Sequence, residues 1–270
     1  MSYTVGNAPE ECGRSGAGTS SRSSTEPTAL LPGVGLDLPP LMPATFLERL
    51  SRFSAIVELP EGPTKVCVRN SGRLRELLHP GATVWLRHVP GPLRKTAHDI
   101  VLAGEPDALV VVDAHLANPL AARWLEARPP WEFARGATSV VREVGYSNSR
   151  LDFQLGRPSG PLWVEVKSVS LCQSGTAVFP DAPTSRGVRH LEHLMELAQR
   201  GEPSAVLFLI LRPDAWRLIP NGDTDPLFAS TLRRAAVSGV TLHALRCRVT
   251  LERVSILGPV PVELHEGVEG

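Results

Sequence analysis

The chain has 270 residues, of which 42% are hydrophobic and 21% are charged, and these proportions are typical of a soluble globular protein. Its 28 basic and 28 acidic residues give a formal net charge of +0, so nucleic-acid binding would have to come from local patches. The longest apolar run, residues 205–211, is too short to cross a bilayer, and the N-terminus lacks a secretory signal. We therefore expect a cytoplasmic protein with no membrane partner.

The first part of the chain divides into a tail and a small barrel. Residues 1–40 are rich in Gly, Ser, Thr and Pro and are predicted to be a disordered tail. Residues 41–103 contain short apolar runs between turn signals, as in a small β-barrel. Residues 41–100 contain nine Lys and Arg but only five Asp and Glu. This surplus of basic residues predicts either a basic face or a scattered solvated surface. The strands are predicted at 53–59, 64–68, 83–89 and 99–103.

From residue 104 to residue 270 the pattern changes to alternating strands and helices. This alternation predicts a mixed sheet that is covered by helices on both faces. The expected strands are 108–112, 139–144, 150–155, 162–171, 205–211 and 240–245. The expected helices are 118–127, 185–199 and 225–237, and Pro183 and Gly201 flank the second of them.

Two neighbouring strands carry the candidate chemistry. In the first, alternation places Arg150, Asp152 and Gln154 on one face, and in the second it places Glu165 and Lys167 on one face. The Gly- and Pro-rich segment 156–161 turns the chain back between them. If the strands pair, Asp152, Glu165 and Lys167 converge on one polar patch.

Such a patch suits a divalent metal ion. Two adjacent carboxylates repel each other, and Mg²⁺ favours one or two carboxylates together with waters and phosphate oxygens. We therefore expect Mg²⁺ on Asp152 and Glu165, where it activates water for attack on a phosphodiester. Lys167 is one of only three lysines in the chain, and it supplies a point charge for the attacking water or the developing negative charge.

The non-catalytic alternative is an exposed, salt-bridged strand pair. An Asp followed later by Glu-x-Lys is a short pattern, which often occurs by chance. A second constellation, His190, His193 and Glu196, has helical spacing but lacks the H-E-x-x-H order of a zinc site. A solvated helix face is the favoured interpretation there. The four cysteines form no C-x-x-C pair, which favours reduced thiols over a zinc ribbon.

Several motifs together resemble the sugar fermentation stimulation protein A family, over residues 46–264. The strongest are Asn148-Ser149-Arg150-Leu151-Asp152-Phe153, Val164-Glu165-Val166-Lys167, and the segment 179–187 with the helix positions that follow it. The barrel region adds Arg52-Phe53, Asn70-Ser71-Gly72, 77–81 and Arg94-Lys95-Thr96.

The resemblance implies an α/β protein with a small OB-like β-barrel at the N-terminus, followed by a restriction-endonuclease-like mixed α/β domain. It also implies DNA binding and a role in regulating sugar (maltose) metabolism genes. Asp152, Glu165 and Lys167 take the nuclease-type positions. The nucleic-acid-binding residues expected on this basis are Arg69, Asn70, Arg94, Lys95, Arg150, Arg186 and His190.

This chain departs from the family pattern at a few positions. Ala122 and Arg123 stand where relatives often carry paired acids, which leaves Glu126 as the remaining candidate ligand on that helix. Three hypotheses follow: a Mg²⁺-dependent nuclease, a DNA-binding regulator whose nuclease-like domain is idle, and, less favoured, an enzyme acting on a small sugar phosphate. No phosphate-binding loop supports the third hypothesis.

Overall fold

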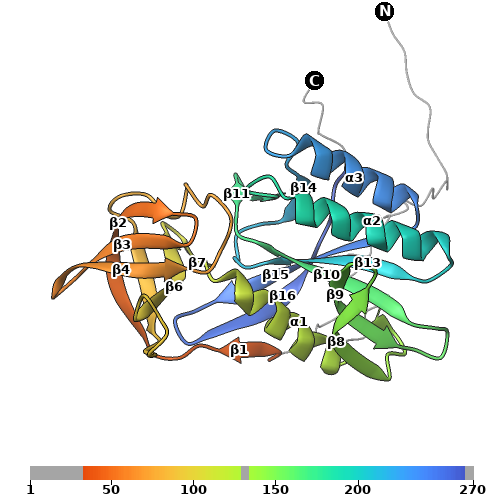
Figure 1. The fold of residues 1–270 in the computed structure, drawn as a ribbon, viewed down its shortest axis with the longest axis horizontal. Coiled ribbons are helices and arrows are strands. Elements are labelled where there is room, and N and C mark those ends of the chain that lie inside the picture. Colours follow the sequence, from red (N-terminus) through yellow and green to blue (C-terminus); the bar gives the residue numbers. More distant parts are fainter. Residues whose placement is uncertain (1–32, 129–133, 265–270) are drawn as a thin grey trace, which may run out of the picture.

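A computed structural model describes residues 33–128 and 134–264. The described chain forms a β-barrel beside a larger α/β domain (Figure 1). Residues 1–32 of the predicted tail lie outside the described residues. Residues 35–37, which were also assigned to that tail, instead form strand β1 (Gly35–Asp37), which pairs antiparallel with the last strand of the α/β domain.

The barrel closes on itself but is not a simple meander, because β5 pairs with β2 rather than with β4. Strand β2 pairs with β3 and β5, β3 with β4, and β5 with β6, all antiparallel, and a short parallel pairing of β4 with β6 closes the ring. Alternate apolar side chains of these strands, such as Val57, Val66 and Val84, fill a separate core. The predicted OB-like barrel is thereby confirmed. The strands are β2 (Leu41–Ser51), β3 (Ser54–Leu59), β4 (Gly62–Val68), β5 (Thr83–His88) and β6 (His98–Glu105).

The boundary between the two parts lies later than predicted. Ala108–Val111, assigned from the sequence to the second domain, is strand β7, which forms a hairpin with β6. A turn at Pro106-Asp107 joins the two strands, so the apolar run continues the barrel sheet rather than starting a new one. The 3-10 helix η1 (Ala114–Leu116) then leads directly into helix α1 (Ala117–Glu126).

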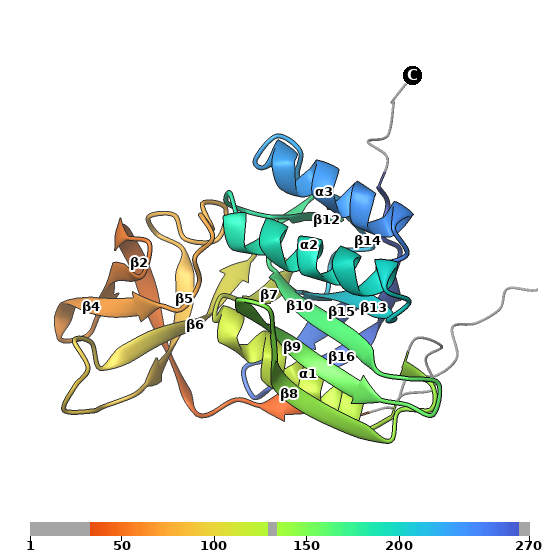
Figure 2. The same ribbon diagram turned by 45° about the vertical axis from the view of Figure 1, so that its right-hand side comes forward.

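The α/β domain is built on a seven-stranded mixed sheet in the order β1-β16-β15-β13-β10-β9-β8. Its centre, β10–β13–β15, is parallel and its flanks are antiparallel. Helices α2 (Ser185–Gln199) and α3 (Pro226–Val237) lie on one face and α1 lies on the other (Figures 1 and 2). The strands are β8 (Ser139–Tyr146), β9 (Ser149–Gly156), β10 (Leu162–Val169), β13 (Ser204–Ile210), β15 (Thr241–Val249) and β16 (Arg253–Val260).

The local sequence explains why these elements form where they do. All seven residues of β13 are buried, as expected for a parallel strand covered on both faces. Helix α2 begins after Thr184, whose hydroxyl accepts a hydrogen bond from Gly187 N at 3.0 Å. Asp225 caps α3 in the same way through Phe228 N at 2.9 Å. The predicted helices 185–199 and 225–237 are confirmed.

A small second sheet lies between α2, α3 and the barrel. It consists of β11 (Cys172–Gln173), β12 (Thr176–Phe179) and β14 (Arg217–Pro220), none of which was predicted as a separate strand. After β12, the carboxylate of Asp181 accepts a hydrogen bond from Leu74 N of the barrel at 2.7 Å. This contact ties the two parts together next to α2. Within the described residues, no helix is long and apolar enough to cross a membrane.

Candidate nuclease-like site

The candidate site lies where the β8–β9 hairpin breaks its regular pairing. Arg142 pairs with Phe153 and Val144 with Leu151, but no pairing joins Glu143 and Asp152 between them. Glu143 has φ 53°, a left-handed conformation that is costly for a residue other than glycine. On the other side of β9, the pairing with β10 ends at Val164–Phe153. Asp152 therefore lies in a gap between three strands.

The break changes which face each side chain takes. Strict alternation, which placed Arg150, Asp152 and Gln154 on one face of this strand, puts Leu151, Phe153 and Leu155 together on the other face. Instead, Phe153 and Leu155 belong to the core on the α1 side, whereas Leu151 belongs to the core under α2 and α3. The alternation prediction is wrong across Asp152 because the hairpin bends at Glu143, which brings its tip against α2. There, Ser149 Oγ lies 2.7 Å from His193 Nδ1.

Asp152 is held by two hydrogen bonds. Its Oδ1 accepts one from Asn118 Nδ2 of α1 at 2.7 Å, and its Oδ2 accepts one from Val166 N of β10 at 2.7 Å. The backbone amide of β10 that faces the gap is thus bonded to this carboxylate. Burial, followed by the negative charge of Glu165, raises the pKa of Asp152 above its ordinary value. Because Val166 directly follows Glu165 on β10, its hydrogen bond to Asp152 places the two acidic residues beside each other.

Glu165 lies on β10 with only 2% of its surface exposed. Its Oε1 accepts a hydrogen bond from Lys167 Nζ at 2.6 Å and also contacts His190 Nδ1 of α2. Burial alone would raise the pKa of Glu165, but the charge of Lys167 and the hydrogen bond from His190 outweigh it and lower the pKa. Its Oε2 is buried and has no hydrogen-bond partner among the described residues. An anionic oxygen is thus available for a ligand.

His190 connects this acid to a cation. Arg186 Nε donates to His190 Nε2 at 3.4 Å, so Nε2 acts as the acceptor and the proton of a neutral ring lies on Nδ1, toward Glu165. His190 and His193 are both buried, with 3% and 6% exposure. The predicted solvated face is therefore wrong for these two histidines, because the bent hairpin and β10 cover that side of α2. Of the three residues His190, His193 and Glu196, only Glu196 is exposed.

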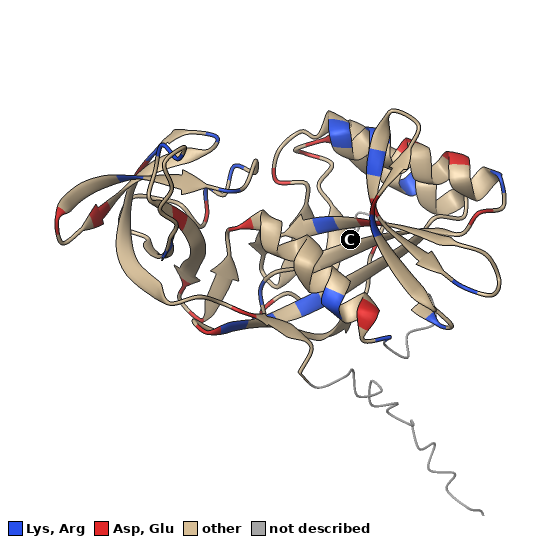
Figure 3. Ribbon diagram, turned by 60° about the horizontal axis from the view of Figure 1, so that its bottom comes forward, with Lys and Arg blue, Asp and Glu red and all other residues tan. Residues whose placement is uncertain are grey.

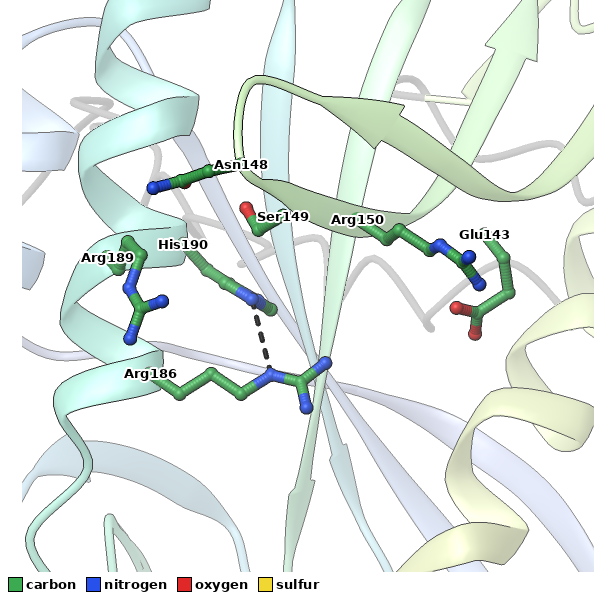
Figure 4. Close-up of a pocket in the computed structure, with 7 residues that line it drawn as sticks. All are labelled: Glu143, Asn148, Ser149, Arg150, Arg186, Arg189 and His190. Atoms are coloured by element: carbon green, nitrogen blue, oxygen red, sulfur yellow. Dashed lines mark hydrogen bonds between the residues drawn. The ribbon is translucent and has the colours of Figure 1, made fainter.

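An open pocket lies directly beside His190. Figure 4 shows Arg186 and Arg189 entering it from α2 and Arg150 from the hairpin. The three guanidinium groups belong to exposed residues, and Glu143 also lines this pocket. We call it the hairpin pocket. Its arginines give it the charge to hold a phosphate beside His190, which contacts Glu165, and it brings together Arg150, Arg186 and His190 of the residues predicted to bind nucleic acid.

The predicted barrel residues are divided in their roles. Arg94 binds the buried Asp99, Arg69 lies 3.7 Å from both Asp99 and Asp113, and Asn70 donates to Val112 O at 3.0 Å. These three side chains are engaged with the protein, so the structure gives them a structural role. Lys95 is exposed on the loop between β5 and β6. Figure 3 shows basic and acidic residues on both parts of the molecule.

Helix α1 contributes to the site through a residue that the sequence did not single out. Asn118 in its first turn binds Asp152, whereas Glu126, the expected extra ligand, lines a different pocket near Arg128 and Ser139. Eight residues separate the two positions, or about 12 Å along a helix. The sequence signal that could have pointed to Asn118 is the pair Asn118-Pro119, which places a polar side chain at the start of a helix.

A closed OB barrel joined to a mixed α/β domain that holds a buried Glu165 beside the partly buried Asp152 and Lys167 defines a two-domain protein of the restriction-endonuclease-like class. The family described as "Sugar fermentation stimulation protein RE domain" matches residues 115–253, and "SfsA N-terminal OB domain" matches residues 47–112. The chain belongs to the sugar fermentation stimulation protein family.

Relatives match over nearly their whole length. A sugar fermentation stimulation protein homolog of Moorella thermoacetica is 45% identical and matches over 83% of this chain and 97% of its own length. That of Aquifex aeolicus is 38% identical over 82% and 98%. A solved structure of Pyrococcus furiosus SfsA in complex with Ca²⁺ has a TM-score of 0.77 and 28% identity, covering 84% of this chain and 98% of that one.

Proposed function

We propose that this protein binds nucleic acid, most specifically DNA, and hydrolyses its phosphodiester bonds with the help of Mg²⁺. The observation that carries the proposal is the unpartnered Oε2 of Glu165 beside Asp152 and Lys167, next to a pocket lined by three arginines. A structural ion pair would need neither the free anionic oxygen nor the adjacent basic pocket.

The residues present fit a hard divalent cation. Asp152 and Glu165 would hold it, because a cation between them offsets the burial and the repulsion by Glu165 that together raise the pKa of Asp152. Within the described ranges, no group of three or more His, Cys, Asp and Glu residues is arranged to hold a metal, and Mg²⁺ ordinarily takes only one or two carboxylates from the protein. The relative from Pyrococcus furiosus has been solved with Ca²⁺, which also prefers oxygen ligands.

The bound cation would supply Lewis-acid activation of a phosphoryl oxygen and of water. The chain's own groups then do the rest. Lys167 Nζ lies at Glu165 Oε1, at 2.6 Å, where an ammonium orients a water or balances growing negative charge. His190 fixes the carboxylate of Glu165 from the other side. Arg150, Arg186 and Arg189 bind the phosphate backbone at the entrance.

Incubation of the purified protein with labelled DNA should give cleavage with Mg²⁺ and none with EDTA. Asp152→Asn removes the charge but keeps the shape, so we expect the cleavage rate to fall at least about 100-fold. Glu126→Gln is the matched control, since it neutralises an exposed acid of the same domain away from the site. Equal cleavage by the wild type and Asp152→Asn would assign the activity to a contaminant.

A second candidate function is a DNA-binding regulator of sugar (maltose) metabolism genes without cleavage. It is favoured by the internal pairing of the site, since both oxygens of Asp152 and one of Glu165 already accept hydrogen bonds. The same assay separates the two: DNA binding without any Mg²⁺-dependent cleavage would leave the regulator.

A further inference from the structure

The barrel carries an aromatic residue that no internal packing explains. Phe53 is 54% exposed and lies in the loop between β2 and β3, the first two strands of the barrel. This loop is anchored, because Val68 N donates to Phe53 O at 3.0 Å. A single exposed apolar side chain is common on protein surfaces, so what makes this ring a binding candidate is the set of groups around it.

Phe53 lines a pocket together with two free-standing cations. Lys65 of β4 and Lys95 of the β5–β6 loop lie in the same pocket as Phe53 and are exposed. We call it the barrel pocket. The β2–β3 and β5–β6 loops join the first to the second and the fourth to the fifth strand of the barrel, and in OB folds these two loops border the oligonucleotide-binding face.

The barrel pocket continues into a second depression. Ser51 lines both the barrel pocket and a groove of about 870 Å³ between the barrel and the α/β domain. The groove presents exposed Arg52, Arg73 and Arg75 on the barrel side, and among the described residues that line it Asp181 is the one acid. We call it the interdomain groove.

The interdomain groove in turn adjoins the hairpin pocket beside His190. Arg186 lines both the groove and the hairpin pocket, which also contains Arg150 and Arg189. The three depressions therefore form a connected series from Phe53 to His190. Among the described residues, eight exposed lysines and arginines line the three depressions, compared with two acids, Asp181 and Glu143. This local surplus of positive charge occurs in a chain whose formal net charge is +0. Arg49 and Arg94 also line the depressions, but their guanidinium groups already bind protein groups, so the eight do not include them.

We propose that a single, unpaired nucleic-acid strand lies along these three depressions, with one base stacked on Phe53 and its phosphates on the arginines, ending at Glu165. Stacking on an exposed ring requires a base free of its complementary strand, and the charge surplus suits a phosphate backbone. This inference rests on the proposed function and specifies its substrate as single-stranded.

Binding is measured best with the full chain by fluorescence anisotropy in EDTA, which prevents cleavage. The probes are 5′-labelled oligo-dT and oligo-U of 5, 10 and 20 nucleotides and a 20-base-pair duplex. We expect the 20-nucleotide strand to bind at least 10-fold more tightly than either the duplex or the 5-nucleotide strand. The two sugar types show whether DNA or RNA is preferred.

Phe53→Ala should weaken binding of the 20-nucleotide strand about 10-fold, the scale of one lost base stack, and Phe53→Trp should restore it. Trp216→Ala is the matched control. That ring is 64% exposed as well, but it packs under Arg246, 3.9 Å from the guanidinium carbon, and lines none of the three depressions. Arg73→Glu tests the interdomain groove in the same assay and should weaken long strands more than short ones.

Failure of this inference is distinct from failure of the proposed function. Tight binding that is unchanged in Phe53→Ala, or that favours the duplex, overturns the single-strand path but leaves Mg²⁺-dependent cleavage standing. Absence of binding to every nucleic acid by folded protein overturns both and points to another occupant, such as a protein partner.

Discussion

Glu165→Gln is expected to reduce the Mg²⁺-dependent cleavage rate at least about 1000-fold, more than any other single change in the site. The reason is that this one carboxylate faces three groups: Lys167, His190 and the position offered to a cation. An amide keeps the shape but removes the charge that Lys167 opposes. Single-turnover cleavage of a labelled 20-nucleotide strand measures the effect directly.

The same substitution should also lower the free energy of unfolding, by about 1–3 kcal/mol, because the side chain of Lys167 is only 10% exposed and loses its anionic partner. Urea unfolding checks this value and establishes a temperature at which the variant is fully folded for the rate measurement. Glu192→Gln, on an exposed position of α2, is the control for a neutralised acid. A folded Glu165→Gln protein that cleaves at the wild-type rate would remove Glu165 from the reaction.

Much of the fold follows from the sequence because its signals are local. Thr184 and Asp225 mark helix starts, and the uninterrupted apolar run of 205–210 indicates a central parallel strand. The site residues were also found locally, since Glu165 and Lys167 are two positions apart on one strand. Their pairing with Asp152 was expected from the turn at 156–161.

What the sequence did not provide depends on distant contacts. Asn118 lies 34 positions from Asp152, and His190 lies 25 positions from Glu165, so no spacing rule connects them. The bend at Glu143 is equally hidden, because a left-handed conformation at a glutamate has no sequence signature. As a result, alternation gave the wrong face for Leu151, and α2 appeared solvated where the hairpin covers it.

The roles of the charged residues in the barrel also could not be predicted from the sequence, because they depend on distant contacts. A surplus of four basic residues suggested a nucleic-acid face, but Arg69 and Arg94 turn inward to Asp99 and Asp113. Both acids are fully buried, and neither was predicted to matter. Their ion pairs with these buried acids make Arg69 and Arg94 counter-ions, whereas the exposed lysines Lys65 and Lys95 have no such partner among the described residues.

Asp99→Ala is accordingly expected to destabilise the barrel by about 1–3 kcal/mol, since three partly exposed arginines lose a fully buried anionic partner. Arg87 Nη2 lies 2.9 Å from Asp99, Arg69 lies 3.7 Å away, and Arg94 also contacts it. Asp99 is on β6 opposite Cys67 of β4, the pairing that closes the barrel. The midpoint of urea unfolding, monitored by circular dichroism, measures the loss, and Asp107→Ala in the exposed β6–β7 turn is the control.

The nucleic-acid affinity of the same variant then separates the two roles of the arginines. If Arg69 and Arg94 act only as counter-ions, folded Asp99→Ala protein at low temperature should bind a single strand within about twofold of the wild type. A gain of several-fold would mean that Asp99 restrains cations able to bind phosphate, and a stability within about 0.5 kcal/mol of the wild type would mean that the cluster does not hold the barrel closed. The two measurements together test whether barrel closure and strand binding depend on different basic residues: the arginines paired with Asp99 at the seam, and the exposed lysines beside Phe53.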